Sequence, residues 1–410
     1  MKKITALVIS LTIWNLGVAQ NLVINNARII DGNGRTFEQG SLVIRDGRIV
    51  SISESAVFGE GVRIDADGMT VMPGLIDTHR HLFAGVVERP LFYGDRLQTA
   101  MIPVLEGLLE KGLTTVLSPT DPLPAIFALR QRIADGELKG PRLLTVGPAF
   151  TAPDDWPVQI CRDDVQCRSL MMVEVNDPSQ AQARVAEIAA LGVDAIKVVY
   201  DSNIVPSVRL DDQVFEAIAE EARRQNLDTI VHVGTVEEML TVVRLGADRL
   251  VHVPAFGRIA ETDGAVKLRE AGVPVTTTVS WYSPAIEEAR GVERSPEQVT
   301  MLADALANIR HIWDEGVIVA FGTDNPPPLG PTEFIVEVQE LSAVLSPEEI
   351  IMSITRNAAM YLNLGDELGT LESGKIADIV IIDGDPLADI MTLANVKVVI
   401  QSGRVAVDNR

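Results

Sequence analysis

The sequence predicts an α/β fold: a TIM-type (β/α)8 barrel with a small β-sandwich domain built from both chain ends. Between residues 71 and 365, eight apolar strand patterns alternate with helical patterns, and this count and length fit a parallel barrel. Residues 20–70 and 366–410 instead alternate short apolar runs with turns, and neither stretch is large enough to hold a core alone. We therefore expect the two ends to pair into one domain beside the barrel.

Residues 1–19 have the layout of a secretory signal peptide. Lys2-Lys3 give a positive start, residues 4–16 form an apolar run, and Gly17-Val18-Ala19 form a small-residue cleavage site. The apolar run is too short for a stable membrane anchor, and no cysteine stands near the cleavage site to carry a lipid. We expect a periplasmic or secreted protein without a membrane anchor. An ordinary buried strand or helix is the alternative for this segment.

The composition is that of a folded protein with a strong negative charge. Of 410 residues, 47% are hydrophobic and 22% are charged, and the net charge is −22 at pH 7. This charge argues against nucleic acid or an anionic membrane surface as a partner. It says little about a substrate.

The small domain begins with strand patterns at residues 21–25 and 41–45. Asp46-Gly47, between apolar runs, is a strong hairpin signal. Similar apolar runs return at residues 377–384 and 396–400. These patterns favour a sheet whose strands come from both termini.

The barrel begins with residues 71–82, which read as a buried strand running into two histidines. Seven further strands are expected at residues 114–118, 142–146, 195–200, 229–233, 249–253, 273–280 and 317–321. Helical patterns fill the gaps, for example at residues 211–225, 236–245, 264–271 and 295–315. An open doubly wound sheet is the alternative, but no glycine-rich dinucleotide loop follows any strand.

His79 and His81 end the first strand and predict a metal site. Side chains on a strand alternate, so Asp77, His79 and His81 point to one side, where two imidazoles can hold one metal ion. The chain has only five histidines, which makes this prediction testable within the sequence. His232 and His252 also fall at strand ends, whereas His311 lies in a helical pattern with no expected role.

Two further residues complete the candidate set. Lys197 lies inside an apolar strand, where a charged amine is costly, and Asp324 follows the eighth strand. Each residue has an ordinary structural interpretation, such as a cation paired with a carboxylate, a hydrogen-bonded core histidine or a helix cap. The same placement recurs for six residues, and the set as a whole favours a metal site on the barrel rim.

Cys161 and Cys167 are the only cysteines. In an exported protein they can form a disulfide that closes a small loop. Free thiols and a pair of metal ligands are the alternatives.

Sequence motifs that resemble those of one enzyme superfamily run along nearly the whole chain. They are Pro73-Gly74-Leu75-Ile76-Asp77-x-His79-x-His81, Gly192-Val193-Asp194-Ala195-Ile196-Lys197, Val231-His232, Gly246-Ala247-Asp248-x-x-x-His252, Gly322-Thr323-Asp324, Thr355-Arg356-Asn357-Ala358-Ala359 and Gly369-x-Leu371-x-x-Gly374-Lys375-x-Ala377-Asp378. The chain resembles the amidohydrolase superfamily, in the branch of imidazolonepropionase-like proteins and metal-dependent Xaa-Pro dipeptidases.

The resemblance implies a centre of two divalent metal ions, with zinc as the default metal. His79, His81 and Asp324 would hold one ion, and His232 and His252 the second. Lys197, carboxylated on its amine by carbon dioxide, would bridge both ions. A shared water would become hydroxide and attack a carbonyl, and Asp324 would accept its proton and pass it to the leaving amine.

The resemblance has departures that bear on the substrate. Related dipeptidases often carry an Arg-Asp pair after strand two, where this chain reads Val116-Leu117-Ser118-Pro119-Thr120-Asp121. Residues 149–173 form an expected long loop that could be a specificity lid or a solvated surface loop. Tyr200 is a candidate catalytic residue that could hydrogen-bond a substrate carbonyl, with packing as the alternative. Arg80 is expected to face away from the metals, and Pro326-Pro327-Pro328 to stiffen a pocket wall.

The resulting hypothesis is an exported metal-dependent hydrolase of amide bonds in dipeptides or N-acyl amino acids. A cyclic-amide, carbamate or ester hydrolase on the same site is the second hypothesis. A non-catalytic binding protein is the third, and it is disfavoured because no candidate ligand is missing. The expected partner is a small-molecule or peptide substrate, and a homo-oligomer is left open.

Overall fold

The computed structural model of the chain describes residues 21–58, 61–83, 95–161, 164–203, 209–290, 293, 295–324 and 334–410. The predicted signal peptide at residues 1–19 and the run Pro326-Pro327-Pro328 lie outside these residues.

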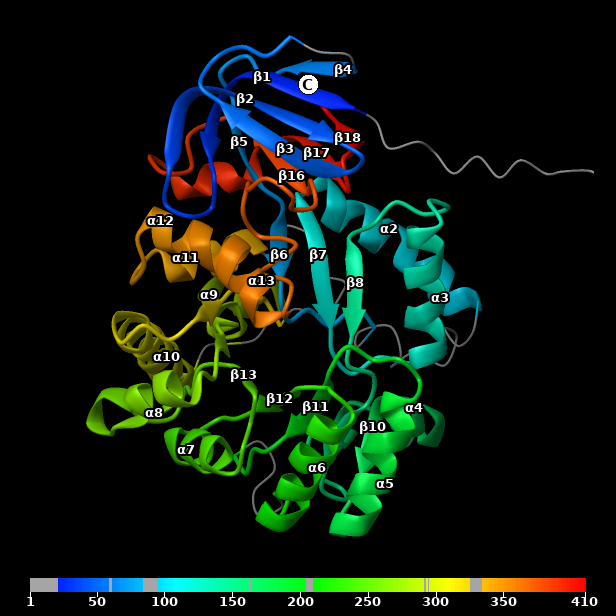
Figure 1. The fold of residues 1–410 in the computed structure, drawn as a ribbon. Helices are drawn as coiled ribbons and strands as arrows, with labels where there is room; N and C mark the ends of the chain where they lie inside the picture. Colours follow the sequence, from blue (N-terminus) through cyan, green and yellow to red (C-terminus); the bar gives the residue numbers. More distant parts are fainter. Residues whose placement is uncertain are drawn as a thin grey trace, which may run out of the picture.

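The two ends of the chain form one eight-stranded sheet, seen as blue and red strands together in Figure 1. Its strands in spatial order are β18 (Arg404–Asp408), β17 (Val396–Gln401), β16 (Ile379–Ile382), β5 (Thr70–Pro73), β1 (Leu22–Ile30), β2 (Thr36–Arg45) and β3 (Arg48–Ser53), with β4 (Val62–Asp65) beside β1. The N-terminal and C-terminal halves meet where β16 pairs antiparallel with β5. The separate sheet domain predicted from both chain ends is confirmed.

The predicted hairpin joins β2 to β3. Asp46 and Gly47 both have positive φ, 49° and 78°, which is the backbone of the tight turn that suits two twisted antiparallel strands. Apolar side chains of these strands, among them Leu22, Ile24 and Leu42, are fully buried in a core that belongs to this sheet. The sheet domain therefore has its own apolar interior beside the barrel.

The barrel contains eight parallel strands that surround a common axis. They are β6 (Leu75–Asp77), β7 (Leu113–Ser118), β8 (Arg142–Thr145), β11 (Ile196–Val199), β12 (Thr229–His232), β13 (Arg249–Val251), β14 (Val275–Thr276) and β15 (Val319–Ala320). Regular pairing runs from β6 to β8 and from β11 to β15. Backbone bonds also connect these groups: Asp194 N donates to Thr145 O at 2.8 Å, and Thr78 N donates to Phe321 O at 3.0 Å. The predicted TIM-type barrel is confirmed.

Helices pack around the barrel strands (Figure 1). They are α2 (Asp95–Glu110), α3 (Leu123–Ala134), α5 (Pro178–Ala189), α6 (Asp212–Arg224), α7 (Val236–Arg244), α8 (Gly264–Ala271), α9 (Pro284–Arg290), α10 (Pro296–Asp314), α11 (Phe334–Leu341), α12 (Pro347–Met352) and α13 (Ala358–Tyr361). Several begin with capping boxes, as at Thr235 with Glu238 and at Ser295 with Gln298, which satisfy the first free N–H groups. None of the helices in the described ranges is long and apolar enough to cross a membrane.

The region expected to be a long loop at residues 149–173 is instead largely regular. It contains β9 (Ala149–Thr151), a 3-10 turn at Val158–Cys161, α4 (Val165–Met171) and β10 (Met172–Glu174). β9 pairs with β10 and touches β11 through Phe150 and Val198. Strands of three residues are too short to show the alternation that identifies a strand in a sequence. The prediction that this region is a loop is therefore wrong.

The apolar run that contains the first histidines is shared between the two domains. β5 lies in the terminal sheet and β6 in the barrel, and Gly74 stands between them. Gly74 N also donates to Asp378 O of the C-terminal segment. The chain thus leaves the sheet a few residues after the predicted boundary at residue 70 and enters the barrel directly.

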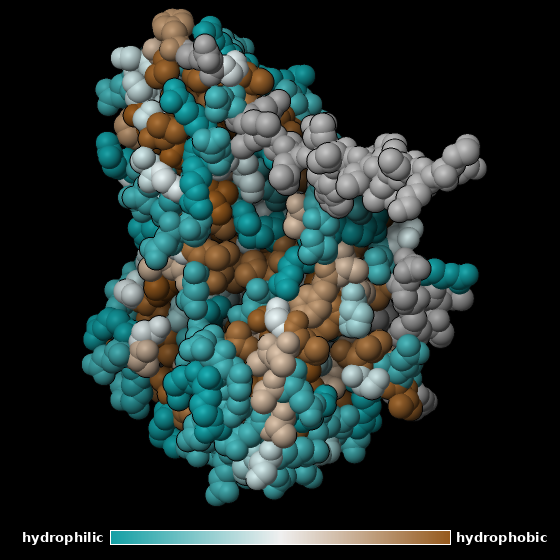
Figure 2. Space-filling view, turned by 45° about the vertical axis from the view of Figure 1, so that its right-hand side comes forward, coloured by the Kyte–Doolittle hydropathy of each residue, from teal (hydrophilic) through white to brown (hydrophobic). Residues whose placement is uncertain are grey.

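Charged and polar residues cover most of the surface in the space-filling view. Apolar residues show through across the middle of this face, below the lobe formed by the terminal sheet (Figure 2).

Candidate metal centre

The candidate ligands gather in one pocket at the carboxyl ends of the barrel strands. The cavity has a volume of about 540 Å³, and its lining includes all six residues predicted to hold metal: His79, His81, Lys197, His232, His252 and Asp324. Residues from five different strands or strand ends therefore converge, as expected for the functional end of a barrel.

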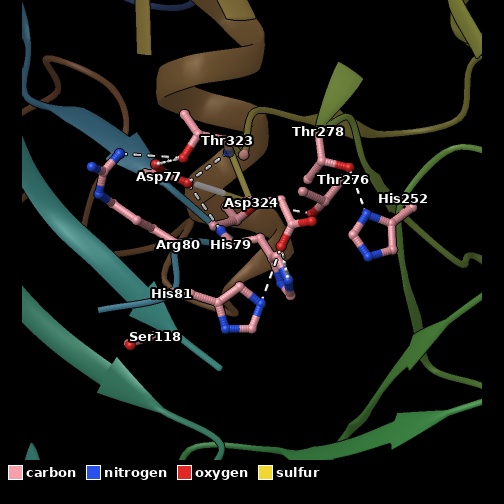
Figure 3. Close-up of polar contacts among 12 residues, drawn as sticks. Asp77, His79, Arg80, His81, Ser118, His252, Thr276, Thr278, Thr323 and Asp324 are labelled. Atoms are coloured by element: carbon pink, nitrogen blue, oxygen red, sulfur yellow. Dashed lines mark hydrogen bonds and ion pairs between the residues drawn. The ribbon is translucent and has the colours of Figure 1, made fainter. Parts of the chain in front are cut away.

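Asp77 connects the end of β6 to the segment after β15 through hydrogen bonds. Its Oδ1 accepts hydrogen bonds from the backbone N of His79 and of Thr323, both at 3.1 Å, and its Oδ2 accepts one from Thr323 Oγ1 at 2.8 Å. Asp324 N donates in turn to His79 O at 2.7 Å. These bonds fix the backbones of His79 and Asp324 against each other (Figure 3).

The Asp324 carboxylate faces both histidines of the first strand. Its Oδ1 lies 3.2 Å from Nε2 of His79 and 3.1 Å from Nε2 of His81 (Figure 3). Burial by itself would favour the neutral carboxyl. The imidazoles of His252, His79 and His81 outweigh burial and hold the pKa of Asp324 well below its usual range. Asp324 is therefore an ionised carboxylate, available as an oxygen ligand.

His252 and His232 are each oriented by an oxygen atom on one side of the ring. Thr278 Oγ1 lies 2.6 Å from Nδ1 of His252, and Asp201 Oδ2 lies 3.0 Å from Nε2 of His232. The two rings are 4.4 Å apart between centroids. An oxygen partner on one ring nitrogen fixes the ring and leaves the other nitrogen for a metal.

Two glycines make room for this arrangement. A Cβ atom on Gly322 would lie 2.5 Å from Thr276 Cγ2 and 3.1 Å from His79 Cβ. A Cβ atom on Gly234 would lie 2.6 Å from Asp201 Oδ2. The glycine in Gly322-Thr323-Asp324 and the one after His232-Val233 therefore let neighbouring side chains approach the centre closely.

Backbone strain is concentrated at the same place. His252, Thr278 and Asp324 have φ values of 70°, 60° and 55°, which lie in the left-handed region. Such conformations cost on the order of 1–3 kcal/mol each for residues other than glycine. The sharp bends let strand ends aim side chains into the pocket.

Lys197 is buried among these groups, with its Nζ lacking a hydrogen-bond partner in the part of the chain that the structure describes. Burial lowers the pKa of Lys197 to about 7, although the Asp324 carboxylate acts in the opposite direction. Burial, together with the nearby Lys197, also lowers the pKa of His79 to about 3. The amine is thus available in its neutral, nucleophilic form near pH 7.

This chemistry fits metal ions. Within the described residues, Nδ1 of His79, Nδ1 of His81 and Nζ of Lys197 are buried without hydrogen-bond partners. Ligand atoms of His79, His252 and Asp324 all lie within 4.8 Å of one another. Neutral imidazoles around one carboxylate are suited to divalent cations such as zinc.

Tyr200 does not lie in the pocket, which corrects its predicted role as a catalytic residue. Its side chain is fully buried, its hydroxyl donates to Asp212 Oδ1 at 2.5 Å, and its ring packs edge-on against Phe215. The alternation along β11 explains this position. Since Lys197 points inward, Val199 and Asp201 do so as well, and Tyr200 points toward α6.

Three residues of the site were not predicted from the sequence. Asp201 and Thr278 orient the histidines, and Tyr282 lines the pocket. The same alternation that excludes Tyr200 could have identified Asp201, four residues after Lys197. Thr278 and Tyr282 had no such signal, because the predicted strand at residues 273–280 ends early and continues as a 3-10 turn at Val279–Tyr282.

Other predictions near the site have clear outcomes. Arg80 extends away from the imidazoles, and its Nη1 donates to Thr323 Oγ1 at 3.4 Å (Figure 3). Asp121, at the place of the missing Arg-Asp pair, accepts hydrogen bonds from Ser118 and Thr145 and joins β7 to β8. Cys161 and Cys167 are bonded, with Cα atoms 5.4 Å apart. His311 lies on α10, as expected.

Comparison with known proteins identifies the family to which the chain is similar. Residues 70–406 match the amidohydrolase family. The imidazolonepropionase of Caldanaerobacter subterraneus subsp. tengcongensis is 24% identical over 387 residues, covering 86% of this chain and 85% of that protein.

Two solved structures share the fold. The crystal structure of a Xaa-Pro dipeptidase with bound methionine in the active site has a TM-score of 0.80 at 23% identity and covers 94% of this chain and 99% of that chain. The structure of molinate hydrolase has a TM-score of 0.79 at 22% identity and covers 95% of both chains.

The hydrogen bond to His252 gives a direct test of the centre. Thr278→Val keeps the shape of the side chain but removes the oxygen beside Nδ1, so the ring loses its fixed orientation. We expect metal affinity to fall about 10–100-fold, measured by competition with a chromogenic chelator. Thr241→Val, which removes a hydroxyl on the surface of α7, should leave affinity unchanged. Equal affinities for both variants would contradict the proposed arrangement of His252.

Proposed function

The chain belongs to the amidohydrolase family and is a hydrolase of carbon–nitrogen bonds, and from this premise we propose that it is an exported enzyme with two metal ions that cleaves amide bonds of the dipeptide or N-acyl amino acid type. The observation that carries the proposal is the buried Lys197 amine, which has no hydrogen-bond partner in the described ranges and lies in a pocket lined by four imidazoles and Asp324.

A carboxylated Lys197 would resolve the cost of burying this amine. The neutral amine attacks the carbon of carbon dioxide, a nitrogen–carbon bond forms, and one proton leaves the nitrogen. One C=O π bond opens, and the product carries a single negative charge shared by two oxygens in place of an unsatisfied amine. Because the imidazoles of His79 and His252 are neutral at pH 7, an anion and cations together satisfy the site better than either alone.

The chain supplies ligands for two cations. His79, His81 and Asp324 would hold one, His232 and His252 the other, and the carboxylated Lys197 would contact both. When bound, such cations lower the pKa of water and polarise a carbonyl oxygen. Zinc is the metal that this set of nitrogen and carboxylate ligands favours.

Asp324 is suited to move the proton. One carboxylate oxygen faces His79 and His81, which leaves the second oxygen to accept a proton from the attacking water. The same oxygen can pass this proton to the nitrogen of the leaving amine, so that the broken C–N bond yields an acid and an amine.

Tyr282 takes the role that the sequence assigned to Tyr200. Tyr282 lines the pocket. Burial, followed by the charges of Asp324 and Asp201, raises the pKa of Tyr282, so the phenol keeps its proton. A protonated hydroxyl can donate to the substrate carbonyl oxygen as negative charge develops there.

The disulfide supports export. Cys161 and Cys167 are both buried and bonded, and disulfides persist in oxidising compartments such as the periplasm or the cell exterior. This agrees with the signal-peptide pattern in the sequence and with the proposed periplasmic or secreted location.

A substrate panel tests the proposed reaction. Protein with measured metal content should cleave dipeptides or N-acyl amino acids faster than lactams, carbamates or esters. Asp324→Asn should lower turnover about 100-fold or more, because an amide cannot accept the proton. Faster cleavage of lactams, carbamates or esters would contradict the proposed dipeptide or N-acyl amino acid substrate class. Wild-type rates in a fully metal-loaded Asp324→Asn protein would refute the proton-transfer role.

Lys197→Ala tests the bridge between the metals. We expect loss of one or both metals per folded chain, counted by elemental analysis, because no other residue of β11 supplies two bridging oxygens. Small carboxylic acids should partly restore metal content and rate by occupying the vacated space. Lys267→Ala, on the surface of α8, is the control. Two metals retained with full activity in Lys197→Ala would rule out the bridge.

Tyr282→Phe tests the hydrogen bond to the substrate. Removal of a donor to a developing oxyanion should lower kcat by about 100-fold while KM and metal content change little. Tyr200→Phe is the matched control, since that hydroxyl donates to Asp212 outside the pocket. Equal kcat values in the two variants would assign the phenol of Tyr282 to packing.

A further inference from the structure

The walls of the pocket beyond the metal centre are largely apolar. One group of lining residues comes from residues 151–174, here called the wall segment: Trp156, Pro157, Ile160, Met171 and Met172. The other elements contribute Val233, Phe256, Trp281, Tyr282 and Met301. Apart from the six metal-centre residues, the charged side chains in the described lining are Asp201, which is bonded to His232, and Glu297.

The wall segment is held firmly at its two ends. The guanidinium of Arg168 contacts the carboxylate of Glu174 and lies 2.6 Å from Asp154 Oδ1. Asp154 N donates to Glu174 Oε2 at 3.0 Å, and Thr151 Oγ1 donates to Trp156 O at 2.6 Å. These contacts connect the start of the segment to its end.

The disulfide holds the middle of the wall segment. Cys161 ends the turn that contains Ile160, and Cys167 lies on α4, whose last residue is Met171. Both cysteines are buried within the apolar core. The bond therefore joins the two elements that present apolar side chains to the pocket, and the wall is formed before a substrate arrives.

A preformed apolar wall increases the binding affinity of substrates that have apolar surface to bury against it. Each Å² of apolar surface removed from water contributes to binding, and aromatic residues such as Trp156 offer the largest contact. The cavity of about 540 Å³ also has the size of an ordinary small-molecule site. Among the described lining residues, Lys197 is the only lysine or arginine, and apolar side chains make up most of the lining beyond the metal centre.

We propose that the wall segment makes the enzyme selective for amide substrates that carry a large, uncharged apolar group next to the scissile bond. The group is an aromatic or branched aliphatic side chain or acyl chain, and it packs against Trp156, Ile160 and Met171. The Cys161–Cys167 bond keeps this surface in position. This selectivity rests on the proposed amide hydrolysis and names its substrate class.

The experiment compares matched substrates that differ only in one group. Dipeptides or N-acyl amino acids with phenylalanine or leucine at the variable position are compared with those that carry alanine, lysine or glutamate. Wild type should favour the large apolar members by about tenfold or more in kcat/KM. Trp156→Ala should remove most of this preference by raising KM for the large apolar substrates. Ile160→Ala, a smaller change, provides a second variant should Trp156→Ala fold poorly.

Val165→Ala is the matched control, because Val165 lies on α4 in the same segment but is 78% exposed and is not among the lining residues. The paired change Cys161→Ser with Cys167→Ser should weaken the preference without changing metal content. A flat or reversed preference in wild type, or an unchanged preference in both Trp156→Ala and Ile160→Ala, would overturn the proposal.

A binding measurement separates this inference from the proposed reaction. Calorimetry with metal-loaded Asp324→Asn protein reports binding of the same matched compounds without turnover. Tighter binding of the large apolar compounds with no cleavage by wild type would keep the selectivity and reject the amide reaction. Cleavage with equal binding of all members would keep the reaction and reject the selectivity.

Discussion

The buried amine of Lys197 has no hydrogen-bond partner in the described structure. Nδ1 of His79 and Nδ1 of His81 are also buried without partners there. An unsatisfied buried polar group costs about 1–3 kcal/mol. The pKa values of Lys197 and His79 are lowered, so the site avoids packing several positive charges together. The left-handed backbone at His252 and Asp324 adds strain. The site therefore lowers the stability of the folded protein locally, and burial of the large apolar barrel core offsets this cost.

The groups behind the centre are oxygen atoms with fixed positions. Asp77 holds the ends of β6 and β15 together, Thr278 orients His252, and Asp201 orients His232. Glu337 strengthens the same region, because its carboxylate accepts hydrogen bonds from the backbone N of Val279 and of Ser280. The turn that contains Tyr282 is therefore anchored before any substrate binds.

The sequence was sufficient for the barrel, the terminal sheet domain and the six residues gathered in the pocket, because strand ends in a parallel barrel meet at one rim. It failed where the signal depends on direction or on short elements. Tyr200 is adjacent in sequence to the inward-facing positions of β11 but points the other way, and only the alternation from Lys197 reveals this. The strands β9 and β10 have three residues each, too few to show a period. Thr278 and Tyr282 reach the site through a turn that begins with a left-handed backbone at Thr278. Threonine gives no sequence signal for that conformation.

The passage from β5 to β6 has a consequence for how the molecule assembles. β5 pairs with β16, and the bond between Thr70 and Gly384 joins positions 314 residues apart. A chain made from its N-terminus onward cannot complete this sheet until its last strands have been synthesised. Gly74 alone separates β5 from the strand that leads into His79 and His81. A chain interrupted before β16 therefore lacks the strand that pairs with β5, directly before these two histidines.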